Sequence, residues 1–367
     1  MACEIFNTDE VVKVFLSSPV KSCEKYGNGH INGTYLVLAD NRYILQRINH
    51  HVFTDPVRLM ENISKVTDHL RNKATESGQD PKRATLNIVK TKDGSPLFRD
   101  NDGSWWRMYE FCEGTVSLQQ VNSADDFYNC ALAFGRFGGL LADFNAESLY
   151  EVIPKFHNTP SRYDNLLIAI EKDCAGRKDS VKEEISFSKE RADFTSLLEK
   201  AHESGILPLR VTHNDTKLNN VLFDEKTGEA VCIVDLDTVM PGYSVNDFGD
   251  SIRFGANTAT EDEIDLSKVT LDLELFKAYA DGFIKGCEGR LPKEELKLLP
   301  IGAMMMTLEC GMRFLTDYLN GDVYFHTDYP NHNLDRCRNQ FKLFYDMEKK
   351  REQMQNIVNE AIEKHSI

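Results

Sequence analysis

The first third of the chain alternates between apolar and polar residues in the way that β-strands do. Residues 33–48, GTYLVLADNRYILQRI, form two such runs around Ala39-Asp40-Asn41, which is typical of a hairpin. Residues 55–73 then change to helical spacing and open with Asp-Pro, a common helix start. Further strand-like runs follow at 84–89, 97–100 and 104–112. This order predicts a small α+β lobe that spans residues 1–112.

The spacing of apolar residues becomes mostly helical after Gly114. Helical patterns cover residues 125–144, 185–204, 272–287, 298–319 and about 339–364. The last of these is charged, and we expect a packed, half-solvated helix there rather than a coiled-coil strand, because its heptad pattern is short and imperfect. The sequence therefore predicts a second, larger and mainly helical lobe over residues 113–367.

The segment 210–242, RVTHNDTKLNNVLFDEKTGEAVCIVDLDTVMPG, interrupts this helical pattern with strand-like runs. The runs NVLF and AVCIVDLD flank a turn that has Gly228 near its end. If they pair about this turn, residues whose numbers sum to 455 lie opposite each other, as Asn220 and Asp235 do. We therefore expect one amide oxygen and one carboxylate at the open end of the hairpin. Asp237 shares the face of Asp235 if the strand stays extended.

Two oxygen ligands at one place suit Mg²⁺, which takes one or two protein ligands together with phosphate oxygens and water. Asp215 lies on the loop that enters the hairpin, where a carboxylate can orient a hydroxyl group and accept its proton. Lys217 is close enough along the chain to contact a phosphate. The alternative is that these acids and amides serve only as turn residues and helix caps.

Composition limits the kinds of partner that the protein is expected to bind and the cellular compartment in which we expect it. The 367 residues carry 58 acidic and 43 basic side chains, a net charge of −15, which disfavours nucleic acid and anionic membranes as partners. The nine cysteines are scattered and form no C-x-x-C pair, which argues against a zinc site or a disulfide framework. No apolar run has the length of a membrane span, so we expect a cytoplasmic protein.

The pattern H-x-D-x-K-x-x-N, followed by a hairpin and an Asp, resembles the catalytic segment of protein-kinase-like phosphotransferases. The strings THND, NNVLFD and IVDLD are similar to the aminoglycoside phosphotransferase family. Longer strings resemble the bacterial N-acetylhexosamine 1-kinases; they include YGNGHINGTYLV, DFGDSIRFGA and LECGMRFLTDYLNGDVYF and lie within residues 26–325. The resemblance implies a bilobed kinase-like fold with a small β-rich N-lobe, a larger helical C-lobe and a catalytic hairpin.

The same resemblance implies a reaction and roles for single residues. ATP would phosphorylate the anomeric hydroxyl of N-acetylglucosamine or N-acetylgalactosamine, with Asp215 as the base or orienting group. Asn220 and Asp235 would hold Mg²⁺. Arg313 and Tyr324 would contact the sugar, although an internal ion pair of Arg313 with Glu309 is an alternative from the helical spacing alone.

The nucleotide is expected to bind the N-lobe. The glycine-rich stretch 27–33, GNGHING, fits a loop over the ATP phosphates, with Gly27 and Gly29 next to them. His30 and Asn32 on this loop are expected to reach the sugar.

The strand after this loop departs from the kinase pattern. Gln46 occupies the position of the usual lysine, and Arg47 beside it would face away from Gln46 in a regular strand. Glu61 on the next helix is either the partner of the phosphate-binding cation or a solvated residue. Main-chain groups from Glu110 to Cys112 are expected to contact adenine.

The string DFGD at 247–250 does not provide the metal ligand in this interpretation, because it follows a loop rather than a buried strand. In the family such residues brace the catalytic loop, and Asp250 is a plausible helix N-cap.

Two other functions stay open. One is a kinase for homoserine, a choline-like alcohol or an aminoglycoside, and the other is a nucleotide-binding regulator without activity. We expect a monomer or a weak oligomer.

Overall fold

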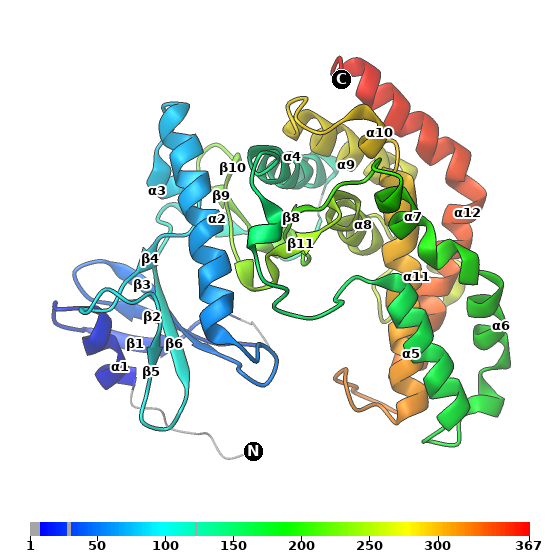
Figure 1. The fold of residues 1–367 in the computed structure, drawn as a ribbon, viewed down its shortest axis with the longest axis horizontal. Helices are drawn as coiled ribbons and strands as arrows, with labels where there is room; N and C mark the ends of the chain where they lie inside the picture. Colours follow the sequence, from blue (N-terminus) through cyan, green and yellow to red (C-terminus); the bar gives the residue numbers. More distant parts are fainter. Residues whose placement is uncertain (1–7, 28–30, 122) are drawn as a thin grey trace. The chain divides into compact units, whose positions relative to one another are not determined.

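The computed structural model describes residues 8–27, 31–121 and 123–367, and the chain divides into two compact units (Figure 1). The first unit comprises Met1–Val116, Ser148–Ile153 and Leu222–Val239, and the second comprises Ser117–Glu147, Pro154–Val221 and Met240–Ile367. This boundary lies beyond Cys112, and two later segments return to the first unit. Strands dominate the first unit and helices the second, in a mixed α+β fold.

An antiparallel sheet forms the framework of the first unit. Its strands run in the order β1-β2-β3-β6-β4, and β5 also pairs with β6. Their bounds are Ser22–Lys25 (β1), Gly33–Leu38 (β2), Arg42–Ile48 (β3), Ile88–Val89 (β4), Phe98–Arg99 (β5) and Trp105–Glu110 (β6). The predicted hairpin at 33–48 is confirmed as β2 and β3. In the register of β3 with β6, Gln46 lies opposite Arg107.

Three helices accompany this sheet: α1 (Thr8–Phe15), α2 (Pro56–Glu76) and α3 (Pro81–Ala84). The start predicted for α2 is confirmed, because the Asp55 side chain accepts a hydrogen bond of 3.1 Å from the backbone N–H of Arg58. Helix α1 packs its apolar side against the sheet in a core that includes Val12, Leu45 and Trp106.

The Asp-rich hairpin belongs to a second sheet with the order β10-β9-β7, formed by Thr115–Ser117 (β7), Val221–Asp224 (β9) and Ala230–Ile233 (β10). Its turn closes with a hydrogen bond from Asp224 N to Glu229 O, two residues whose numbers sum to 453 rather than 455. The register expected from the sequence is therefore wrong. The Asp224 carboxylate accepts the N–H groups of Lys226 and Thr227, and this side-chain turn shifts the pairing.

The second strand of the hairpin is also shorter than expected. It ends at Ile233, Asp235 has a left-handed backbone (φ 60°), and Leu236–Thr238 forms a 3-10 turn, η5. Asp237 therefore does not continue an extended strand beside Asp235, as the sequence analysis assumed.

The second unit is mainly helical. Its α-helices are Ala124–Leu140 (α4), Thr159–Lys172 (α5), Lys182–Glu190 (α6), Leu197–Glu203 (α7), Ser244–Gly255 (α8), Leu273–Gly286 (α9), Lys293–Leu296 (α10), Leu299–Asn320 (α11) and His332–Lys364 (α12). Helix α11 packs against α5, α8 and α12. Strands β8 (Arg210–Thr212) and β11 (Met240–Gly242) form a small antiparallel pair. Across the described residues, no helix has both the length and the apolar character to span a bilayer.

Two helix predictions in this unit need correction. The helix expected at 185–204 is interrupted by a 3-10 stretch, η3 (Ala192–Ser196), because the hydroxyls of Thr195 and Ser196 donate to carbonyls three residues earlier. The C-terminal helix begins at His332 rather than near Asn339. The charged residues in the first turns of this helix obscure its apolar periodicity in the sequence.

Helices α4 and α9 approach each other through glycines. A Cβ atom on Gly135 would lie 2.1 Å from the carbonyl oxygen of Phe283, and one on Gly286 would lie 2.4 Å from that of Leu132. A Cβ atom on Gly282 would lie 2.4 Å from the carbonyl oxygen of Tyr128, and one on Gly139 would lie 2.9 Å from that of Cys287. The two helix backbones are therefore in direct contact, which no larger residue at these positions would allow.

Candidate active site

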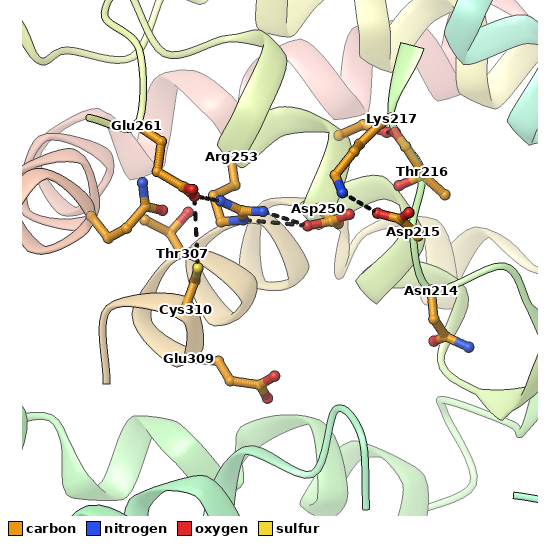
Figure 2. Close-up of polar contacts among 12 residues, drawn as sticks. Asn214, Asp215, Thr216, Lys217, Asp250, Arg253, Glu261, Thr307, Glu309 and Cys310 are labelled. Atoms are coloured by element: carbon orange, nitrogen blue, oxygen red, sulfur yellow. Dashed lines mark hydrogen bonds and ion pairs between the residues drawn. The ribbon is translucent and has the colours of Figure 1, made fainter. Parts of the chain in front are cut away.

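Strand β8 leads into a loop that carries three of the predicted site residues. The Asp215 carboxylate lies 2.7 Å from the Nζ atom of Lys217. Asn220, in the 3-10 turn η4 (Leu218–Asn220) before β9, donates through Nδ2 to the backbone oxygen of Asp215 at 2.8 Å and to its Oδ2 at 3.3 Å. The structure thus brings Asp215, Lys217 and Asn220 together, and Figure 2 shows the first two pointing toward each other.

Asp247 on α8 holds the backbone of this loop. Its two carboxylate oxygens accept the N–H groups of His213 and Asn214, each at 2.8 Å, and its carbonyl accepts the hydroxyl of Thr216. Asn214 has φ 64°, a left-handed conformation that these bonds stabilise. The expected bracing role of an Asp in the DFGD string is found here, in the buried carboxylate of Asp247.

A row of charged side chains extends from the loop into the helical unit (Figure 2). Asp250 pairs with Arg253 at 2.9 Å, and Arg253 also pairs with Glu261. Burial alone would lower the pKa of Lys217, but Asp215 and then Asp250 outweigh it and raise that pKa. Lys217 is therefore a cation beside the Asp215 carboxylate.

The sequence-based role of Asp250 as a helix N-cap is wrong. Helix α8 begins at Ser244, directly after β11, so Asp250 lies inside the helix and its carboxylate faces Arg253. The MPGYSVN segment is thus a short strand and a first helical turn rather than a loop. The buried ion pair makes this position suitable for an acid within a helix.

The residues predicted to hold Mg²⁺ fit such an ion by chemistry. Both hydrogen bonds of the Asn220 amide use Nδ2, and its Oδ1 accepts none from the residues that the structure describes. Asp235 follows β10 and is held in a left-handed conformation. An amide oxygen and a carboxylate are both donors that Mg²⁺ accepts, and joint binding of an ion by Asn220 and Asp235 stays a prediction.

Gln46, which stands where the kinase pattern has a lysine, contacts Arg107, a residue that the sequence analysis did not identify. Gln46 on β3 accepts a hydrogen bond of 3.0 Å from Nε of Arg107 on β6 and donates to Thr34. The Nη1 atom of Arg107 lies 2.5 Å from Oδ1 of Asp237, and the two side chains are 1% and 4% exposed. An arginine within the otherwise apolar run WWRMY was the available signal.

The Arg107 guanidinium is charged in this environment. Burial alone would lower its pKa, but Asp237, through its charge and its hydrogen bond, together with Tyr109 and Asp235 outweighs burial, so the pKa lies above its ordinary value. Glu61, the partner considered from the sequence, is exposed on α2. Its neighbour Asn62 is buried and donates to the carbonyl groups of Tyr150 and Val239.

The glycine-rich loop is described in part. Gly27 has φ 73°, whereas Gly29 and His30 lie outside the described residues. Asn32 donates to Oδ2 of Asp237 at 2.5 Å and accepts the N–H of Asn49 at 2.9 Å. Its amide is thus engaged within the first unit, and its contact with a sugar stays a prediction.

The segment expected to bind adenine continues β6. The N–H of Glu110 donates to Asn87 O, and that of Phe111 donates to Arg42 O. The carbonyl of Cys112 accepts the hydroxyl of Thr115. These bonds fix the backbone of the segment, and its contact with adenine stays a prediction.

Arg313 on α11 is a half-buried cation between aromatic rings. Its guanidinium lies 5.6 Å from the ring centre of Phe156 and 5.5 Å from that of Phe325, and no described residue gives it a hydrogen bond or ion pair. Glu309, the alternative partner, binds His157 at 2.9 Å and Thr159 at 2.7 Å instead. The ion pair considered from helical spacing is therefore replaced by these contacts.

Tyr324 lies on a loop near the end of α11 and is 70% exposed. The buried Asp317 carboxylate accepts three consecutive backbone N–H groups of this loop, at positions 323–325, at 2.8 to 3.0 Å. Asn333 donates to the same carboxylate. Asp317 therefore fixes the loop that carries Tyr324 and Phe325, and this role was not recognised from the sequence.

Several solved structures are similar to this chain. An aminoglycoside phosphotransferase from Alicyclobacillus acidocaldarius superposes with a TM-score of 0.62 at 15% identity, covering 99% of this chain and 98% of the other. A microcompartment-associated aminopropanol kinase gives 0.60 at 15% identity, with 95% and 97% covered. An amicoumacin kinase, solved with AMP-PNP, Ca²⁺ and its substrate, gives 0.58 at 14% identity, with 92% and 93% covered.

These likenesses establish an aminoglycoside-phosphotransferase-like kinase fold. The model of the phosphotransferase enzyme family (APH) matches residues 22–280, which include the glycine-rich stretch, Arg107, the loop that carries Asp215 and the Asp-rich hairpin. The chain therefore belongs to the phosphotransferase enzyme family, as the HNDTKLNN pattern and the α+β fold indicate.

Proposed function

We propose that this phosphotransferase transfers the γ-phosphate of ATP to the anomeric hydroxyl of an N-acetylhexosamine, N-acetylglucosamine or N-acetylgalactosamine. The resemblance of the long strings within residues 26–325 to N-acetylhexosamine 1-kinases supports the substrate. The geometry of the catalytic loop supports the reaction. We also propose a cytoplasmic location, on the composition described above.

In this proposal Asp215 orients the anomeric hydroxyl and accepts its proton. An anomeric hydroxyl is more acidic than an ordinary alcohol, so a carboxylate is an adequate base. Lys217, held at 2.7 Å from Asp215, would neutralise charge on the transferred phosphoryl group. Asn220 and Asp235 would hold Mg²⁺, which when bound neutralises the ATP phosphates.

The observation that supports a sugar acceptor is the unpaired Arg313 guanidinium. A cationic acceptor, such as choline or an aminoglycoside, would be repelled by this group, whereas hydroxyl and acetamido oxygens accept hydrogen bonds from it. Arg162 is a second arginine in this region: burial and then the charge of Arg313 lower its pKa, so the two guanidinium groups repel each other. Glu309 interacts with Arg313 only through its charge, because its carboxylate oxygens hydrogen-bond His157 and Thr159. The region around Arg313 therefore favours a neutral or anionic acceptor.

The test is Mg²⁺-dependent release of ADP with N-acetylglucosamine and N-acetylgalactosamine, with the phosphorylated position read by NMR. We expect the 1-phosphate from the wild type and a loss of at least about a hundredfold in kcat for Asp215→Asn. Arg313→Met should raise KM for the sugar and leave KM for ATP unchanged. Arg290→Met, which removes an exposed arginine paired with Glu288, is the matched control.

Two outcomes would replace this proposal. Turnover of homoserine or choline but of neither sugar would keep the reaction and reject the acceptor. ATP binding without turnover of any acceptor would favour a nucleotide-binding regulator, which the Lys-to-Gln difference at Gln46 first suggested.

A further inference from the structure

We propose that Arg107 and Asp237 are positioning residues that tie the loop carrying Asp235 to the end of the glycine-rich loop. In this role the Arg107–Asp237 pair replaces the ion pair that a lysine at position 46 would form. The inference rests on the proposed function in one respect, the assignment of Asp235 as a metal ligand.

The first observation is the place of Arg107 in the sheet. It lies opposite Gln46 in the β3–β6 register, and its Nε donates to the Gln46 amide oxygen at 3.0 Å. The positive charge that is absent at position 46 of β3 is therefore supplied by the neighbouring strand. Because Arg107 is 1% exposed, this charge contacts other side chains of the first unit rather than solvent.

The second observation is that both carboxylate oxygens of Asp237 are engaged. Its Oδ1 lies 2.5 Å from Arg107, and its Oδ2 accepts the Asn32 amide at 2.5 Å. Asp237 is therefore held in place from both sides, by the ion pair at Oδ1 and by the hydrogen bond at Oδ2. It joins β6, the last part of the glycine-rich stretch and the turn η5 in one buried cluster.

The third observation concerns the backbone of Asp235, which lies two residues before Asp237. Its φ of 60° is unfavourable for a residue with a side chain and persists only where neighbouring contacts fix it. The buried pair anchors η5 directly after this residue. Loss of the anchor should let Asp235 relax toward ordinary backbone angles and move its carboxylate.

The experiment measures binding without turnover. Mn²⁺ affinity in the presence of a non-hydrolysable ATP analogue is followed by electron paramagnetic resonance. Amide hydrogen exchange over residues 235–238 is followed in the metal-free protein. The variants are Arg107→Gln, Arg107→Lys, Asp237→Asn, Asn32→Ala and the double variant Arg107→Gln/Asp237→Asn. Arg71→Gln, which removes the ion pair of the half-buried Arg71 with the exposed Asp68 on α2, is the control.

We expect each single variant except Arg107→Lys to weaken Mn²⁺ binding about tenfold and to speed exchange over 235–238. Arg107→Lys should retain part of the affinity, because the charge is kept while the fork geometry is lost. The double variant should bind more tightly than the sum of the two single losses predicts, because no buried charge is left unpaired.

Wild-type binding and exchange in Arg107→Gln and Asp237→Asn, or strictly additive losses in the double variant, would overturn the proposal. If these two variants do not fold, Asn32→Ala becomes the test of the anchor, since it removes a neutral hydrogen bond and leaves the ion pair. Unchanged exchange in Asn32→Ala would then count against the anchor. Because no readout uses a sugar, failure of the acceptor assignment would show as absent turnover with the pattern of Mn²⁺ binding preserved.

Discussion

Replacing Gly135 by alanine tests whether α4 and α9 are in backbone contact. The added Cβ would lie 2.1 Å from Phe283 O and 2.9 Å from its carbonyl carbon, whereas real Cβ contacts essentially never fall below 3.0 Å. The helices would have to separate by nearly the difference between these distances. Both contacting atoms belong to the backbone, so a side-chain rotation cannot relieve the clash.

Gly138→Ala on the same helix separates this clash from helix propensity. No atom lies within 4 Å of its added Cβ, so this variant should gain about 1 kcal/mol from helix propensity alone. Gly135→Ala gains the same amount but loses about 1–3 kcal/mol to overpacking. The difference in free energy of unfolding between the two variants therefore isolates the overpacking cost. We expect this cost to lie at the upper end of the range.

Urea unfolding followed by circular dichroism measures this difference. We expect a lower midpoint for Gly135→Ala than for Gly138→Ala at an unchanged slope, since the surface exposed on unfolding is the same. Equal midpoints for the two variants would refute the reasoning, because they would mean that the helices separate at no cost.

Three further predictions concern buried carboxylates. Asp247→Asn replaces an acceptor of backbone N–H groups by a donor, and kcat should fall about tenfold or more in steady-state assays, with the melting temperature showing whether the fold is kept. Asp317→Asn should accelerate hydrogen exchange at residues 323–325 and raise KM for the acceptor, while KM for ATP stays as in the wild type. Burial alone would raise the pKa of Asp250, but the positive charges around it, Arg253 first and then Lys217, together outweigh burial and lower that pKa. The stabilising contribution of Asp250 is therefore present above about pH 4 and is lost as pH falls through the folded-state pKa. Melting temperatures from pH 3 to 7 should therefore fall less steeply toward acid in Asp250→Asn.

Much of the fold was predictable because it depends on local patterns. The hairpin of β2 and β3 and the start of α2 at Asp55 follow from alternation and capping. The interruption at 192–196 and the turn at Asp224 were missed, since side-chain bonds to the backbone override periodicity there. No local pattern could show that residues 148–153 and 222–239 return to the first unit.

The candidate site was likewise predictable only where its residues lie close together in the sequence. The loop residues from His213 to Asn220 stand close together in the sequence, and the structure keeps Asp215, Lys217 and Asn220 in contact. Partners that are distant in sequence were not predicted, because nothing in a run such as WWRMY says which acid will face its arginine. The Arg107–Asp237 pair joins residues on β6 and η5, and only the tertiary structure reveals it.

The discontinuous first unit has a consequence for the order of assembly during synthesis. Residues up to Val116 leave the ribosome long before Leu222–Val239, the segment that supplies β10, most of β9 and the counter-charge of Arg107. Until then β7 lacks its neighbour β9, and an arginine destined for the interior has no acid beside it. A fragment ending at Val116 should therefore aggregate rather than fold. The first unit is completed only after more than half of the chain has been made.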